Sequence, residues 1–169
     1  MIKIIPAMFA LENFQHWLHV LSAVIWIGSI LYTWWVMVPS AVSAYPLEEA
    51  VFHIVSLEKK FKKIAHPVMV IIIVTGVMNL ISPESMEKMK ASPLFGILLA
   101  VKLLLLTFLI TAHVHRHTHY SKRILAATTG NKIDAAGLEI WRKTKRLLVL
   151  QGIAGIIIIF IGVSLESAV

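Results

Sequence analysis

Four long apolar segments dominate the pattern of hydrophobic and polar positions along the chain. They cover approximately residues 14–38, 64–81, 94–114 and 147–165, and each is close to the ~20 residues that a helix needs to cross the hydrocarbon core of a bilayer. Because lipid offers no hydrogen-bond partners to the backbone, such segments predict helices. The sequence therefore predicts an all-α fold, a four-transmembrane-helix bundle that forms one integral membrane domain over residues 1–169.

The polar connections have patterns of their own. Apolar residues from Val51 to Phe61 recur at helical spacing, which predicts a short amphipathic helix at the membrane interface that runs into the second span. The sequence TTGN at residues 128–131 predicts a turn. Asp134 is a candidate N-cap for a helix that continues into the fourth span.

The positive charges are unevenly distributed between the two sides of the predicted bundle. The connections after the first and third spans lie on one side and are rich in Lys and Arg. The opposite side holds only Lys3, Lys88 and Lys90. By the positive-inside rule, both termini are predicted to face outside, in an inner (plasma) membrane of bacterial type, with the basic connections in the cytoplasm. The connections after the first and third spans hold twelve Lys or Arg residues: Lys59, Lys60, Lys62, Lys63, Arg116, Lys122, Arg123, Lys132, Arg142, Lys143, Lys145 and Arg146.

The composition narrows the functional classes. Hydrophobic residues make up 58% of the chain and charged residues 15%, against about a quarter charged in soluble domains. In so apolar a chain, the net charge of +7 indicates loops that face a lipid bilayer rather than a nucleic-acid partner. Cysteine is absent, which excludes disulfides, thiolate metal sites and cysteine catalysis.

Ionisable residues inside predicted spans are candidates for function, because lipid makes them costly. His66 lies near the start of the second span and His113 near the end of the third, so both lie at a similar depth on neighbouring antiparallel helices. Facing imidazoles from two helices are the axial ligands that a b-type haem requires. The alternative for each histidine is a polar side chain that reaches the membrane interface.

A second site is predicted nearer the outer face. His16 and His19 have i,i+3 spacing and share one helix face, where together they could hold a metal ion. Lys102 and His113 are eleven residues apart, roughly 1100° of helical turn, so both point to one side of the third helix and Lys102 is predicted to face into the bundle. This second site could take another haem, a copper ion or a substrate.

The segment HVHRHTHY at residues 113–120 concentrates histidines at the end of the third span. Alternating residues of a helix point about 200° apart, so the four imidazoles cannot all face one ion. His113 is predicted to be a buried haem ligand, whereas His115, His117 and His119 are assigned to a solvated helix end. The pairs His113/His117 and His115/His119, each with i,i+4 spacing, are alternatives as chelators of a surface metal.

The segments around these residues resemble successive helices of a membrane superfamily that includes the HemJ-type protoporphyrinogen oxidases and the CopD-like copper-resistance proteins. The resemblance rests on His19 followed by Trp26 and Gly28, on the basic segment before Pro67, and on Lys102 followed eleven residues later by a histidine. It covers about three of the four helices, and it implies b-type haem or porphyrin chemistry on one branch and copper handling on the other. The last span, TKRLLVLQGIAG, lacks the N-E-V-P-like motif of the HemJ-type proteins, and the first lacks their L-P-R, which moves the resemblance towards the CopD-like branch.

The combined prediction is a cytochrome b-like membrane protein with one or two haem b groups. It would act in electron transfer or in small-molecule redox chemistry, as a haem-dependent membrane oxidoreductase. Its redox partner would be a quinol or a protein, and a homo-oligomer is one possible assembly. Two alternatives remain. One is a CopD-like copper-binding or copper-transporting protein without haem that uses His16, His19 and the methionines, and the other is a protoporphyrinogen oxidase.

Overall fold

The computed structural model of the protein describes residues 4–130 and 132–167, and within these ranges it does not describe the side chains of residues 4–10, 12, 166 and 167. Lys3 of the sequence analysis lies outside the described residues. The elements follow in this order: α1 (Ile4–Tyr32), the π-helix η1 (Thr33–Met37), α2 (Val38–Ala44), α3 (Leu47–Leu80), α4 (Pro83–Ala91), α5 (Pro93–His115), the π-helix η2 (Arg116–Tyr120), α6 (Ser121–Ala126), β1 (Thr128–Thr129), β2 (Lys132–Ile133) and α7 (Ala135–Ser167).

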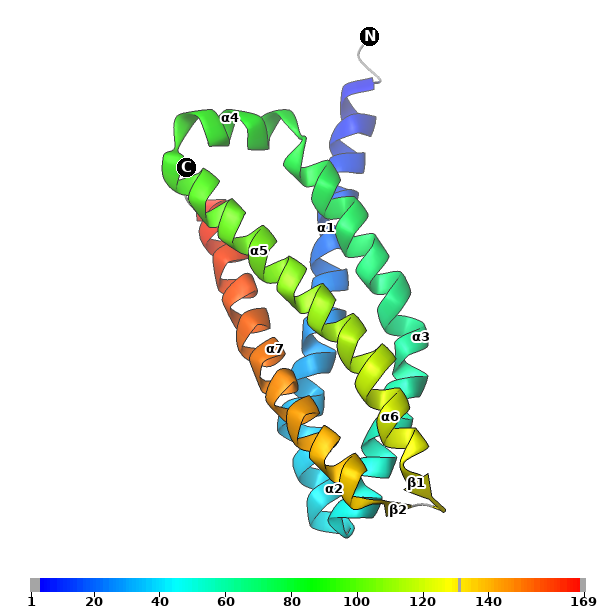
Figure 1. Ribbon diagram of the computed structural model, residues 1–169. Coiled ribbons are helices and arrows are strands. Elements are labelled where there is room, and N and C mark those ends of the chain that lie inside the picture. The colour runs from blue at the N-terminus through cyan, green and yellow to red at the C-terminus, as the bar shows by residue number, and fades with distance from the viewer. Residues whose placement is uncertain (1–3, 131, 168–169) are drawn as a thin grey trace.

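The predicted all-α bundle of four membrane-spanning helices is confirmed (Figure 1). In the described part of the chain, four helices have the length and apolar composition needed to cross a membrane. They are longer than the apolar segments suggest, because α1, η1 and α2 follow without a break, as do α5, η2 and α6. The 34 residues of α3 extend about 51 Å, well beyond a hydrocarbon core of ~30 Å.

Local capping explains where several elements begin. The side chain of Ser82 accepts a hydrogen bond from the backbone N–H of Ser85 at the start of α4, and Ser92 accepts one from Phe95 at the start of α5. Asp134 Oδ1 accepts from Gly137 N at 2.8 Å, so the predicted N-cap of the last helix is confirmed. The predicted turn is the loop of the hairpin between β1 and β2, in which Gly130 adopts a φ of 65°.

The helices pair as α1 with α3 and α5 with α7, and α1 also packs against α7. Figure 1 shows both chain ends and α4 at one end of the bundle, with α2, α6 and the hairpin at the other. The basic end is defined here as α2, the first half of α3, η2, α6, the hairpin and the first turns of α7. Most of the twelve basic residues of the two connections belong to these elements.

Most of the described apolar side chains that are fully excluded from solvent lie at the basic end. Val51, Ile54 and Val55 of α3 and Ile124 of α6 are fully excluded from solvent. The predicted amphipathic segment is the first part of α3, and it continues into the second span as predicted. Its apolar face is covered by other parts of the protein. Along the spanning parts, by contrast, many large apolar residues such as Leu104 and Phe160 are exposed, as expected for surfaces that face lipid.

Two glycines allow α7 to approach α1 and the adjoining η1 closely. A Cβ atom placed on Gly152 would lie 2.5 Å from Cε3 of Trp34, and one placed on Gly155 would lie 2.8 Å from Cγ2 of Ile27. Small residues at membrane helix interfaces permit this approach and the van der Waals contact that it brings. Gly28, on α1, has no atom within 4 Å of an added Cβ.

A buried ion pair joins α3 to η2. The guanidinium of Arg116 donates to Oε1 of Glu58, and the two side chains are only 3% and 4% exposed. Glu58 Oε2 and Arg116 Nε have no hydrogen-bond partner among the described residues. The pair therefore carries a large desolvation cost that only the partner charge offsets.

We predict that Gly152→Ala lowers the thermal unfolding midpoint of the detergent-solubilised protein, followed by helical circular dichroism. The added methyl collides with the Trp34 ring and costs on the order of 1–3 kcal/mol. Gly28→Ala is the matched control, and it should raise the midpoint slightly, because alanine favours a helix over glycine by roughly 0.5–1 kcal/mol. Equal midpoints for the two variants would contradict the close approach of α7 to η1.

A second prediction concerns the buried ion pair. Glu58→Ala or Arg116→Ala each leaves one buried charge without its partner and should destabilise the fold by about 3–5 kcal/mol. The double variant Glu58→Leu/Arg116→Met removes both charges and should be less destabilised than either single variant in the same unfolding assay. A double variant that loses the sum of the two single effects would show that the pair is not energetically coupled.

Candidate functional site

His113 is the most deeply buried ionisable residue among those predicted to be ligands. It lies in the last turn of α5 and is 2% exposed. The indole of Trp26 on α1 meets it edge to face, with ring centroids 5.8 Å apart, and the indole N–H donates to His113 Nδ1 at 3.5 Å. Nε2, the other ring nitrogen, is buried and has no hydrogen-bond partner among the described residues.

Two further imidazoles surround His113, and the three residues His66, His113 and His117 are called the histidine group below. The ring of His66 on α3 lies 6.3 Å from that of His113, at an interplanar angle of 63°. The ring of His117, one turn further along the helix, lies 4.3 Å away at 51°. The expectation that His66 and His113 lie at one depth on facing helices therefore agrees with the geometry, whereas their role as ligands stays a prediction.

The histidine group is not a preformed closed metal site. Within the described residues, no three His, Asp or Glu side chains are arranged so that they could hold one ion. His66 is exposed, whereas His113 and His117 are buried. The group therefore places the exposed His66 and the buried His117 beside His113. His113 Nε2 is buried and has no hydrogen-bond partner among the described residues.

The π-helical turn η2 explains why His117 belongs to this group. Arg116 and His117 are consecutive, yet they are 3% and 6% exposed. The guanidinium of Arg116 pairs with Glu58 and also lies 3.4 Å from His117 Nε2. Such π-turns in long helices often occur at functional sites. The assignment of His117 to a solvated helix end is therefore wrong, because α3 and α7 cover this turn.

The outer part of the same segment remains at the surface, as predicted. His115 and His119 are both exposed, and their rings lie 4.9 Å apart at 33°. The ring of Tyr120 meets His115 edge to face at 4.8 Å. The histidines of residues 113–120 thus divide into one buried pair and one exposed pair, and both have i,i+4 spacing.

The residues predicted to form a second site come from two helices, with His16 and His19 on α1 and Lys102 on α5. His16 is exposed, and His19 is half-buried with Nδ1 at 2.9 Å from the hydroxyl of Thr75 on α3. The half-buried Lys102 extends towards α7, where its Nζ would lie 3.6 Å from a Cβ placed on Gly162. Lys102 therefore does face into the bundle. Thr75 also donates to the carbonyl of Ile71 at 2.6 Å, so its hydroxyl proton is engaged and it accepts from the His19 ring.

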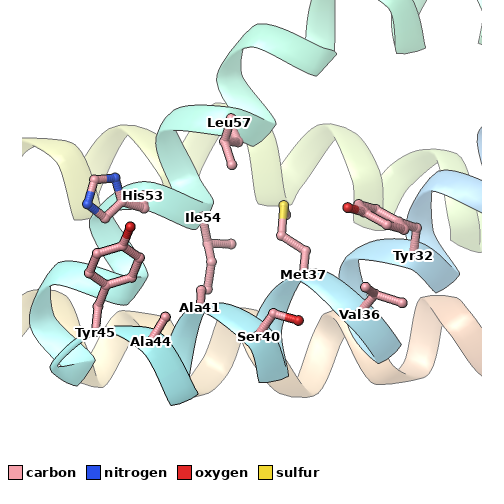
Figure 2. A pocket seen from close by; sticks show the side chains of 10 residues that line it. All are labelled: Tyr32, Val36, Met37, Ser40, Ala41, Ala44, Tyr45, His53, Ile54 and Leu57. Atoms are coloured by element: carbon pink, nitrogen blue, oxygen red, sulfur yellow. The ribbon is translucent and has the colours of Figure 1, made fainter.

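A groove of about 380 Å³ lies at the basic end between α2 and the first turns of α3. It contains one of the candidate soft ligands, Met37, and also His53, which stacks on Tyr45 with ring centroids 4.8 Å apart. Figure 2 shows Met37 and His53 separated along the groove, with Ile54 between them. The two side chains do not converge, so the groove is not a metal site of the methionine and histidine type.

Three residues of the site were not identified from sequence: Glu58, Arg116 and the interior position of Trp26. Trp17 and Trp35 are each 56% exposed, as interface tryptophans are, whereas Trp26 is 1% exposed and contacts His113. Trp26 is therefore an interior residue and not one of the tryptophans typical of a membrane interface. One signal was available, because Trp26 lies two helical turns after His19 in the motif that carries the family resemblance.

Comparison with known proteins gives one match. The family model described as copper resistance protein D matches residues 55–165, which is more than half of the chain. No curated protein and no solved structure matches the chain. The matched region includes Glu58, the histidine group and all of α5. The protein belongs to the copper resistance protein D family, and the copper-related branch of the two resemblances is the one that the comparison supports.

Proposed function

We propose that this protein handles copper ions within the membrane, and that His66 and His113 of the histidine group bind the ion as cargo. The observation that carries the proposal is His113, a buried imidazole with one unpartnered nitrogen beside two further imidazoles. Family membership supports copper association in general, and these residues supply the chemistry for it. The earlier copper alternative used His16, His19 and the methionines. The proposal moves the site to the other end of the spans.

The donor set suits copper. Imidazole nitrogen is a good ligand for copper ions, and no cysteine is present to supply the softer thiolate. A metal ion held between two imidazoles places their ring centroids about 6 Å apart, since metal–nitrogen bonds are ~2.0 Å and each nitrogen lies about 1 Å from its ring centroid. The 6.3 Å between His66 and His113 is close to this value. The spacing therefore favours the two imidazoles as opposed ligands of one ion.

The contact with Trp26 sets a condition on binding. An imidazole that accepts a hydrogen bond at Nδ1 carries its own proton on Nε2 when it is neutral. Binding of copper through Nε2 therefore requires the proton to move to Nδ1, and the indole contact to break. At 3.5 Å this contact is longer than an ordinary N–H hydrogen bond of about 2.7–3.2 Å, so little free energy opposes its loss. Trp26 thus holds the ring in place while the site is empty of copper.

Haem b is the second candidate for the histidine group. The spacing of His66 and His113 suits a bis-histidine iron as well as it suits copper, because both metals form similar bonds to imidazole. The Lys and Arg residues of the basic end would pair with the propionates, and the redox partner would be a quinol or a protein. Optical spectra distinguish the two candidates, since only haem gives a Soret band.

For orientation, we propose that the basic end faces the cytoplasm and both chain ends face outside. The distribution of Lys and Arg supports this topology. Because the chain has no cysteine, labelling of Glu87→Cys and Thr129→Cys with an impermeant maleimide tests it directly. Glu87→Cys should react in intact cells and Thr129→Cys only in permeabilised ones, and the reverse pattern would invert the topology.

We predict that the full chain, purified in detergent, binds Cu⁺ with an affinity that depends on His113 and His66. The measurement is competition against a chromophoric Cu⁺ chelator. Removing one of two ligands should lower the affinity at least roughly tenfold for His113→Ala and for His66→Ala. Trp26→Phe removes the competing indole donor, and because this contact is long it should raise the affinity by no more than about twofold, the lower end of the ~0.5–1.5 kcal/mol of one hydrogen bond.

His19→Ala is the matched control for these variants, because His19 also lies inside a span but bonds to Thr75, away from the histidine group. It should bind Cu⁺ as the unchanged protein does. Loss of binding in His19→Ala alone would move the copper site to the second predicted position. A purified protein with a Soret band that His66→Ala and His113→Ala both abolish would overturn the copper proposal in favour of haem.

A further inference from the structure

The exposed histidine pair is a separate chemical feature from the histidine group. His115 and His119 lie on the side of the helix that faces away from the bundle, whereas His113 and His117 lie inside it. The two pairs are offset by two residues and differ in burial, His113 and His117 being buried and His115 and His119 exposed. One helix therefore presents an i,i+4 histidine pair on each of its opposite sides.

The ring geometry of the exposed pair suits two adjacent ligands of one metal ion. For metal–nitrogen bonds of ~2.0–2.1 Å and bond angles between about 90° and 110°, the centroids of two imidazoles lie roughly 4.5–5 Å apart. The rings of His115 and His119 lie 4.9 Å apart. His115 is the last residue of α5 and His119 lies in the π-helical turn η2; their rings already have this separation, so binding needs no rearrangement of the fold.

The surroundings leave room for further ligands and restrict which ions can bind. The two imidazoles border a shallow groove of about 340 Å³, which has space for water molecules to complete the coordination shell. Its other lining residues are Ile110, Thr111, Val114 and Thr118, and none carries a carboxylate. The exposed Lys122 and Arg123 follow within the next turn. Ions that depend on oxygen ligands and negative charge, such as Mg²⁺ and Ca²⁺, are therefore disfavoured.

We propose that His115 and His119 form a surface site for a late first-row divalent metal ion at the basic end of the bundle. The two imidazoles supply adjacent nitrogen ligands and water supplies the rest. Among these ions Cu²⁺ has the highest affinity for nitrogen sites, followed by Ni²⁺ and Zn²⁺. The site is independent of the histidine group and holds whether the buried group binds copper or haem.

The test is a titration of the full chain in detergent with Cu²⁺, followed by calorimetry and by electron paramagnetic resonance. The unchanged protein should bind one Cu²⁺ whose spectrum shows coupling to two nitrogens. His115→Ala and His119→Ala should each lower the affinity roughly tenfold or more and leave coupling to one nitrogen, because one of two imidazole ligands is lost. Unchanged affinity in both variants would overturn the proposal.

Two controls separate this site from other copper binding. His53→Ala removes a histidine at the same end of the bundle whose ring contacts are Tyr45 and Phe52, and it should leave the Cu²⁺ titration unchanged. His113→Ala should also retain the Cu²⁺ signal while it loses Cu⁺ binding, so failure of the buried site and of the surface site are distinguishable. A Cu²⁺ signal lost in His113→Ala and kept in His115→Ala would assign the ion to the histidine group.

A second measurement does not depend on variants. Diethyl pyrocarbonate modifies accessible imidazoles, and the modified peptides are quantified by mass spectrometry. Cu²⁺ should protect His115 and His119 from modification and leave His53 reactive. Equal modification of all three residues with and without Cu²⁺ would contradict the site.

Discussion

The buried contact between Glu58 and Arg116 is the interaction on which the interior of the basic end depends. It ties the first half of α3 to η2 and holds the π-helical turn in the bundle. With Arg116 in that position, the following His117 also enters the interior and lies against His113. A charge buried to this degree is tolerated only beside its counter-charge, so the geometry of the histidine group is linked to one carboxylate on a neighbouring helix.

The helices are surrounded by two different environments along their length, lipid and water. Along the spans the lateral faces are apolar and exposed, as Leu104 and Phe160 illustrate, and lipid provides their surroundings. At the basic end the same helices continue into water, where burial of apolar surface again drives packing. Ile54 and Ile124 are accordingly excluded from solvent there. The histidine group lies between the two regions, where the last spanning turns give way to the water-exposed part of the bundle.

Hydropathy was sufficient to predict the number and order of the spanning helices, because the requirement for about 20 apolar residues is set by the bilayer alone. It could not predict where the helices end. The residues after Val114 include several charged side chains, so hydropathy alone ends the third span there. The helix nevertheless continues through η2 and α6 to Ala126. The helix cap at Asp134 could be predicted from the sequence because capping involves only residues that are close along the chain. The burial of Arg116 could not be predicted from the sequence, because it depends on Glu58, which lies 58 positions earlier in the chain.

The depth of His113 followed from its position in the third apolar segment, and its match with His66 followed from the antiparallel arrangement of two helices. Its contact with Trp26 did not follow, since composition alone assigns membrane tryptophans to the interface. The burial of His117 was missed for a further reason. Adjacent positions on a regular helix differ by about 100°, and a π-turn changes which of them face inward.

Pro67 has a mechanical consequence for the candidate site. It lies inside α3 immediately after His66, and its ring nitrogen cannot donate to the carbonyl four residues earlier, at Lys63. A helix is most easily bent where such a backbone hydrogen bond is missing. The position at which α3 bends most easily is therefore next to His66, whose ring faces His113. A small change in the separation of the two imidazoles would therefore distort the hydrogen bonding of α3 least at this position.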